Sequence, residues 1–135
     1  MKTSAETIHS VLKFQKHATD HLPIELRPDW LLLIHQQATG RTTPARVTHT
    51  MLVDHTEQDL NGATDKIWHR HWAWIIHGKN LQPLPTPIPI SRLGRASGKN
   101  YGKGAQKFVY LADRDLLDLL KSGLIPASAW GSPVP

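Results

Sequence analysis

The expected fold rests on one stretch, Asp65-Lys-Ile-Trp-His-Arg-His-Trp-Ala-Trp-Ile-Ile-His77, which holds three of the five tryptophans. At about 100° per residue its tryptophans and isoleucines fall on one broad arc of a helix, while Lys66, His69 and Arg70 fall on the other side. We therefore expect a helix over residues 65–77 that ends at Gly78 in a left-handed cap. Because each tryptophan can bury about 150–250 Å², this helix should lie between layers of the structure.

Three earlier segments also have helical patterns. Residues 4–22 place apolar side chains on one side and mainly histidine, lysine and aspartate side chains on the other, as in an amphipathic helix. Residues 30–38 begin with an apolar run, which predicts a buried helix, with a buried strand as the alternative. Residues 44–55 follow the helix-start signal Thr43-Pro44, but their β-branched residues favour a strand. For residues 44–55 we expect the helix, with the strand as the alternative.

The second half of the chain contains less helix. Prolines at every second position of residues 82–90 put their rings on one face of an extended strap, and the aliphatic side chains between them on the other. Residues 108–111 predict a short strand. A helix is expected to begin at Asp113 or Asp115 and to end before Gly123, with its leucines toward the core.

Together these patterns predict a single domain over residues 1–135 that is mainly α with a small β element, in the α+β class. A compact helical domain is expected around the tryptophan-rich helix. Residues 44–55 and 65–77, separated by the turn signal Asn61-Gly62, would form a helix-turn-helix-like unit. The expected order is a helical body (1–81), a proline-rich strap (82–90), a basic glycine-rich segment (91–107), a strand and helix (108–123) and an irregular tail (124–135).

Composition limits the classes of protein that fit this chain. The sequence contains no cysteine, which excludes disulfides and thiolate metal sites and agrees with the reducing cytoplasm, the location we expect. The longest apolar runs are five residues long, whereas a membrane-spanning helix needs about 20. No membrane contact is therefore expected.

The net charge of +5 comes from one part of the chain. Residues 78–110 carry six basic side chains and no acidic one, while the rest of the chain is close to neutral. Within residues 91–107, four glycines alternate with five basic side chains around Tyr101. Glycine lets backbone amides approach phosphate, lysine and arginine neutralise it, and tyrosine stacks on bases. The segment therefore predicts a polyanion-binding loop or hairpin that is pliable before it binds.

We therefore expect a non-enzymatic nucleic-acid-binding protein, an accessory or regulatory factor of the kind that phages and mobile elements encode, with DNA favoured over RNA. The expected contacts come from one set of basic and aromatic residues: Arg92, Arg95, Lys99, Tyr101, Lys103 and Lys107, with Arg46 and Arg70 in support. The same basic surface suits an alternative, a protein-interaction module or inhibitor that binds an acidic protein partner.

A metal-dependent nuclease is the second alternative. Residues 49–69 hold acidic and imidazole side chains of suitable type: His49, Asp54, His55, Glu57, Asp59, Asp65 and His69. Their spacing matches no metalloenzyme motif such as HExxH. We therefore expect no catalytic residue, no metal and no other cofactor.

Protein purified without added metal is expected to contain no zinc or manganese after dialysis, because no set of ligands has the spacing of a metal site. Elemental analysis checks this expectation. A stoichiometric metal that survives dialysis would favour the nuclease alternative over nucleic-acid binding without catalysis.

Overall fold

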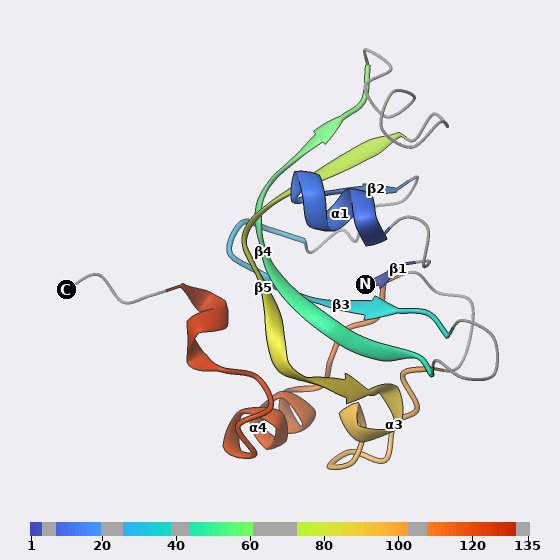
Figure 1. The fold of residues 1–135 in the computed structure, drawn as a ribbon, viewed down its shortest axis with the longest axis vertical. Helices are drawn as coiled ribbons and strands as arrows, with labels where there is room; N and C mark the ends of the chain where they lie inside the picture. The colour runs from blue at the N-terminus through green and yellow to red at the C-terminus, as the bar shows by residue number, and fades with distance from the viewer. Residues whose placement is uncertain (4–7, 20–25, 39–43, 61–72, 103–107, 132–135) are drawn as a thin grey trace.

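Five strands form one sheet in the computed structural model, which describes residues 1–3, 8–19, 26–38, 44–60, 73–102 and 108–131 (Figure 1). The strands are β1 (Lys2–Thr3), β2 (Lys16–Thr19), β3 (Leu31–Gln36), β4 (Arg46–Gln58) and β5 (Trp74–Pro89). Their order across the sheet is β1-β3-β4-β5-β2, with β1 parallel to β3 and the other neighbouring pairs antiparallel. The described helices are α1 (Ile8–Phe14), α3 (Ile90–Leu93), α4 (Asp113–Lys121) and the 3₁₀ helix η1 (Ala127–Trp130).

The expectation of a mainly helical domain is wrong, because the described part of the chain is built on this sheet. Strands occupy most of two segments expected as helices, residues 30–38 and 44–55. Of residues 65–77, the last four begin β5 and residues 65–72 lie outside the described residues. The described parts of these segments therefore do not supply the two helices of a helix-turn-helix unit.

Burial on both faces of the sheet explains why β3 resembles a buried helix in sequence. Leu31 and Leu33 pack against a first apolar cluster, whereas Leu32 and Ile34 belong to a second apolar cluster. A strand that lies between two apolar layers has no polar face. The run therefore lacks the alternation that separates a half-buried strand from a helix, and its strand alternative is confirmed.

The helix expected over residues 4–22 is confirmed only in part. α1 covers Ile8–Phe14, and Gln15, with a φ of 51°, turns the chain into β2. The carbonyl of Gln15 accepts a hydrogen bond from the backbone N–H of Gly78 at 2.7 Å, and its side-chain oxygen accepts one from that of Leu81 at 3.3 Å. The residue that ends the helix therefore also fixes the chain against β5.

The long strands β4 and β5 curve strongly, and their pairing shifts register at three places (Figure 1). Val47 belongs to one apolar cluster, whereas Met51 and Val53 belong to the other. Residues four apart share a face in a regular strand. The irregularities between Val47 and Met51 therefore move the apolar side of β4 from one face to the other, and one strand pair serves both clusters.

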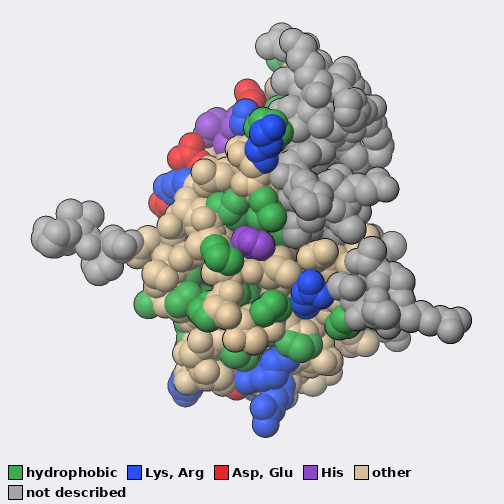
Figure 2. All heavy atoms as spheres, in the orientation of Figure 1, with side chains coloured by type: hydrophobic (Ala, Val, Ile, Leu, Met, Phe, Trp, Pro, Cys, Tyr) green, Lys and Arg blue, Asp and Glu red, His purple; other side chains and the backbone are tan. Residues whose placement is uncertain are grey.

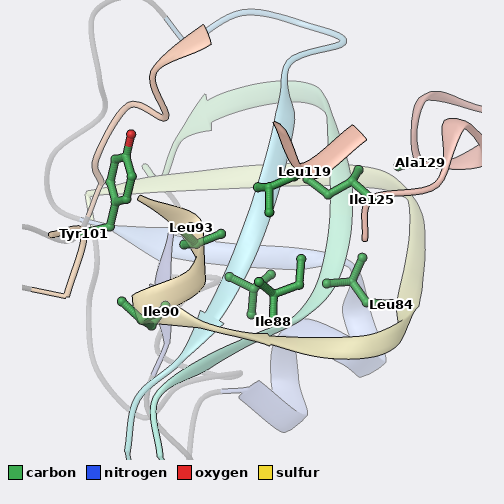
Figure 3. Close-up of a cluster of buried hydrophobic side chains, with 9 residues drawn as sticks. Leu84, Ile88, Ile90, Leu93, Tyr101, Leu119, Ile125 and Ala129 are labelled. Atoms are coloured by element: carbon green, nitrogen blue, oxygen red, sulfur yellow. The ribbon is translucent and has the colours of Figure 1, made fainter. Parts of the chain in front are cut away.

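The proline-rich run is extended, as expected, and forms the end of β5. Figure 3 shows how its aliphatic side chains join those of α3 and the C-terminal region in the first cluster: Leu84, Ile88, Ile90, Leu93, Leu119 and Ile125. The four prolines of the run are exposed, and so is Thr86. The face opposite the prolines therefore packs on the body of the protein, except at Thr86.

The C-terminal helix is confirmed. α4 begins at Asp113, and Gly123 follows its end with a φ of 72°, the left-handed conformation that glycine adopts easily. Leu119 is buried, but Leu117, expected in the core, is 55% exposed. Residues 108–111, expected as a strand, form no regular element. No helix among the described residues is long and apolar enough to cross a bilayer.

The 3₁₀ helix η1 lies in the region expected as an irregular tail and docks on β5. The side-chain amide of Asn80 donates hydrogen bonds to the carbonyls of Ser128 and Ala129 at 2.9 and 3.0 Å. Gln82 donates a further one to the carbonyl of Ser128 at 2.7 Å. These bonds fix the position of Trp130 at the end of η1.

Gly78 is required by a close approach rather than by a helix cap. It lies inside β5, without a positive φ, and an added Cβ would overlap the side chain of Met51. Met51 is fully buried in the second apolar cluster. The thioether therefore occupies the space that any larger residue at position 78 would need.

Gly78→Ala is expected to reduce the free energy of unfolding by about 1–3 kcal/mol, because the new methyl group displaces Met51 in a filled core. Urea unfolding measures this change. In a Met51→Ala background the same substitution should cost less, since the overlapping side chain is gone. An equal cost in both backgrounds would show that the overlap is not the cause.

Candidate nucleic-acid interface

A groove of about 640 Å³ lies between β3 and the chain segment 108–113. Its walls are mainly apolar and include Leu31 and Leu33 of β3. β1 pairs with β3 only at His35 and Gln36. At Leu31, β3 therefore has β4 as its partner on one side and no strand partner on the other, within the part of the chain that the structure describes. This stretch of β3 forms part of the groove wall.

Exposed aromatic side chains line the groove. Trp30 and Tyr110 meet edge to face, with ring centroids 5.9 Å apart. They are 36% and 52% exposed, and Trp130 of η1, which lines the same groove, is 40% exposed. Aromatic faces that remain open to solvent beside an apolar groove can stack on flat ligands.

A few polar side chains interrupt this apolar lining. Asp29 forms an ion pair with Lys79 at 2.7 Å, His35 is 8% exposed, and Asp113 lies in the first turn of α4. An apolar groove with a small number of polar groups is typical of ligand sites, in which shape provides contact area and the polar groups orient the ligand.

The basic segment borders the groove, because its buried residues Leu93 and Tyr101 line it. Between them the chain forms a tight loop in which Gly98, with a φ of 78°, donates a backbone hydrogen bond to Gly94 at 2.7 Å. An added Cβ on Gly94 would overlap the carbonyl oxygen of Lys99. The glycines at 94 and 98 therefore allow a close chain crossing and shape a defined turn within residues 91–102.

Asp115 of α4 holds this loop from within the structure. Its carboxylate is fully buried and accepts hydrogen bonds from the backbone N–H and the hydroxyl of Ser97, at 2.9 and 2.6 Å. It accepts a third from the hydroxyl of Tyr101 at 2.5 Å, and that hydroxyl accepts one from the backbone N–H of Ala112 at 2.9 Å. One carboxylate therefore connects residues 97–101 to the start of α4.

The protonation states of Asp115 and Tyr101 follow from these contacts. Burial opposes ionisation of Asp115, but the hydrogen bonds from Ser97 and Tyr101 outweigh it, so the pKa of Asp115 lies below its ordinary value of 3.8. Burial, and then the bond to this carboxylate, raise the pKa of Tyr101 above its ordinary value of 10.0. At neutral pH the pair is therefore a carboxylate and a neutral phenol.

The structure divides the expected contact residues into exposed and structural ones. Arg95 and Lys99 are exposed and form no ion pair with any described residue. Figure 2 shows basic side chains at the lower end of the visible face, where Figure 1 places α3 and α4. Arg92 forms an ion pair with Asp118 of α4. Tyr101 is only 8% exposed, so its ring packs in the core, and we no longer expect it to stack on a base.

Of the remaining expected contacts, one is half-buried and three are undescribed. Arg46 lies half-buried at the start of β4, opposite Pro89. Arg70, Lys103 and Lys107 lie outside the described residues, and so do Trp68 and Trp72 of the tryptophan-rich stretch.

The sequence pattern alone does not mark Trp30 and Tyr110 as groove residues. Trp30 directly precedes the apolar run of β3, and Tyr110 lies within an apolar run of its own, so both resemble core residues in sequence. Among the described residues, no strand pairs with β3 beside these rings, which is a property of the tertiary structure.

The side chains of the nuclease alternative meet only in part, at the end of the sheet where β4 stops and β5 starts (Figure 2). His55 and His77 are cross-strand neighbours whose rings stack with centroids 4.2 Å apart. His55 is hydrogen-bonded to Asp54 at 2.7 Å and His77 to Glu57 at 2.5 Å. No group of three or more such residues in the described ranges is arranged to hold a metal ion.

The other residues of that alternative are dispersed. His49 is hydrogen-bonded to the hydroxyl of Thr48 at 2.9 Å, and burial lowers the pKa of His49 from its ordinary value of 6.5. Asp59 is buried, at 7% exposure. Asp65 and His69 lie outside the described residues.

Comparisons with known proteins locate the fold. No protein-family model matches the sequence, and no curated protein matches it. Among solved structures, the fold is similar to that of ZmASCH from Zymomonas mobilis, in the crystal structure of a tyrosine-to-phenylalanine mutant. The TM-score is 0.61 at 12% sequence identity, and the match covers 90% of this chain and 94% of that chain. The likeness shows a shared β-rich fold and supports the correction of the helical expectation.

The stability advantage of the wild type over Asp115→Asn is expected to shrink on acidification. The folded pKa of Asp115 lies below the ordinary 3.8, so the unfolded chain takes up the proton first. The stabilisation from the ionised group is complete above about pH 5 and disappears as the pH falls through the folded pKa. Urea unfolding of both proteins across this range measures the difference. A gap that does not change with pH would contradict the ionised, hydrogen-bonded carboxylate.

Proposed function

We propose that this protein binds single-stranded nucleic acid, without catalysis, with bases on the aromatic groove and phosphates on the basic loop. The observation that carries the proposal is that the basic segment forms part of the wall of the aromatic groove. The groove with the exposed rings of Trp30 and Tyr110 is bounded by Leu93 and Tyr101, which belong to the same segment as Arg95 and Lys99. Base-stacking surfaces and phosphate-neutralising charges therefore lie on one part of the molecule. We expect the protein to meet its nucleic acid in the cytoplasm, because a sequence without cysteine agrees with a reducing compartment.

The exposed rings favour an unpaired strand over a duplex. Stacking of a base on an aromatic side chain contributes about 1–3 kcal/mol per base, and it requires an open base face. In a duplex the neighbouring base pairs cover those faces. Stacking does not distinguish DNA from RNA, so the preference for DNA expected from the sequence is tested with both polymers.

The number of available cations sets the expected salt dependence. The charge of Arg92 is balanced by Asp118 and that of Lys79 by Asp29, so neither is counted. Four basic side chains of the segment then remain as candidates for phosphate contacts: Arg95, Lys99, Lys103 and Lys107. At about 0.7 per neutralised phosphate of a single strand, the log–log slope of affinity against salt should be about −2.8.

Anisotropy titrations with single-stranded RNA, single-stranded DNA and duplex DNA at several salt concentrations test the proposal. Both single strands should bind more tightly than the duplex. Trp30→Ala should weaken single-strand binding about tenfold or more, because it removes one stacking face. Phe14→Ala is the matched control, since Phe14 is 41% exposed on α1 and does not line the groove.

A second pair of variants tests the phosphate contacts. Arg95→Gln with Lys99→Gln should reduce the salt slope by about 1.4, which corresponds to two contacts. Lys121→Gln, an exposed substitution at the end of α4, should leave the slope unchanged. Wild-type protein that binds none of the three polymers at low salt would refute the proposal. Capture of an acidic protein that resists nuclease treatment would then favour the interaction module.

A further inference from the structure

We infer that Asp115 is a positioning residue for nucleic-acid binding, because its buried carboxylate holds residues 94–101 in the shape that presents Arg95 and Lys99. The inference rests on the proposed function. It extends that function from the side chains that meet the phosphates to the group that orients them.

The hydrogen bonds of Asp115 reach the chain between the two cations. Ser97 lies midway between Arg95 and Lys99 in the sequence, and both its backbone N–H and its hydroxyl donate to the carboxylate. The hydroxyl of Ser97 also accepts a hydrogen bond from the backbone N–H of Lys99 at 3.1 Å. Tyr101 provides the second attachment at 2.5 Å. A short chain of hydrogen bonds therefore runs from the core to the backbone of a phosphate-binding residue.

The backbone amides of this loop are used internally. The N–H of Gly98 donates to the carbonyl of Gly94, that of Lys99 to the hydroxyl of Ser97, and that of Gly102 to the side-chain oxygen of Asn100 at 3.0 Å. These three amides are therefore engaged within the loop and not turned toward a ligand. Phosphate contacts depend on the side chains of the loop, whose directions follow from the loop shape.

Charge and position predict opposite effects when Asp115 is neutralised. By Coulomb attraction alone, loss of an acidic group beside a polyanion site should strengthen binding. Asparagine has nearly the same size, and its amide oxygen can still accept the bond from the backbone N–H of Ser97, but its NH₂ group cannot accept the bonds that the hydroxyls of Ser97 and Tyr101 donate. The loop then loses most of its anchor, and its cations must be ordered during binding. We therefore expect Asp115→Asn to bind about tenfold more weakly, although the protein becomes more positive.

The experiment compares affinity and salt slope for oligo-uridine and oligo-thymidine, each about 12 nucleotides long. Asp115→Asn should lower the slope by about 1.4, since Arg95 and Lys99 no longer act together. Asp54→Asn is the matched control, because it removes the same charge from an exposed position in the second half of β4. It should bind as tightly as the wild type or slightly more tightly.

A milder pair of variants keeps the test valid if Asp115→Asn does not fold. Ser97→Ala removes the hydroxyl that donates to Asp115 and should weaken binding, whereas Ser97→Thr keeps a hydroxyl and should restore most of the affinity. A role in stability alone would change the unfolding midpoint of these variants but not the salt slope of the folded protein. Equal slopes for the alanine and threonine variants and the wild type would overturn the inference.

The outcomes separate the inference from the proposed function. If the wild type binds the oligonucleotides and Asp115→Asn binds them equally well with the same slope, the positioning role is wrong and the proposed function stands. If the wild type binds neither oligonucleotide, the proposed function is wrong, and trypsin decides whether Asp115 holds the loop. Cleavage after Arg95 and Lys99 should be faster in Asp115→Asn than in the wild type, because the loop is released. Equal cleavage rates would show that Asp115 does not anchor it.

Discussion

The pairing of β4 with β5 is the interaction on which the rest of the structure depends. β3 pairs with one outer edge of this strand pair and β2 with the other, and α3 continues directly from the end of β5. The register shifts turn Val47 and Met51 to different apolar clusters, so a single strand contributes to both. A slip of one residue would exchange the faces and remove apolar side chains from both clusters together. Gly78 and Met51 lie near one of these shifts, where the side chain of Met51 fills the space beside the glycine.

The same arrangement fixes the candidate site. The end of β5 leads through α3 into the basic loop, and the hydrogen bonds from Ser97 and Tyr101 to Asp115 tie that loop to α4. Residues 108–111, which precede α4, line the groove together with β3, and β1 pairs only with the far end of that strand. The site therefore depends on how three distant parts of the chain meet, and no single motif contains it.

Local signals predicted the elements that depend on local chemistry. The start of α4 and the glycine that follows its end were predicted correctly, and so was the extended proline-rich run with its buried aliphatic face. The strands β3 and β4 were not, because burial on both faces erases the alternation of β3, and the register shifts disturb that of β4. The role of Gly78 depends on Met51, which is far away in sequence and adjacent only across the β4–β5 pair. A glycine next to an apolar run therefore reads as a helix cap when only its neighbours in sequence are known.

The candidate site was predictable in charge but not in geometry. Composition identifies the segment that carries Arg95 and Lys99, and both are exposed. Composition cannot reveal that Arg92 is paired with Asp118 or that Tyr101 is bonded to Asp115, since these partners lie on α4.

These tertiary contacts change the expected energetics of binding as well as the number of contacts. A pliable loop must be ordered when it binds, which reduces affinity, whereas a loop already held by a buried carboxylate presents its cations with less loss of entropy. In the proposed binding mode, fewer free charges and exposed aromatic rings shift the balance of binding from long-range attraction toward stacking. A site of this kind depends less on salt than the charge count of its sequence implies, and more on whether the bases of its ligand are unpaired.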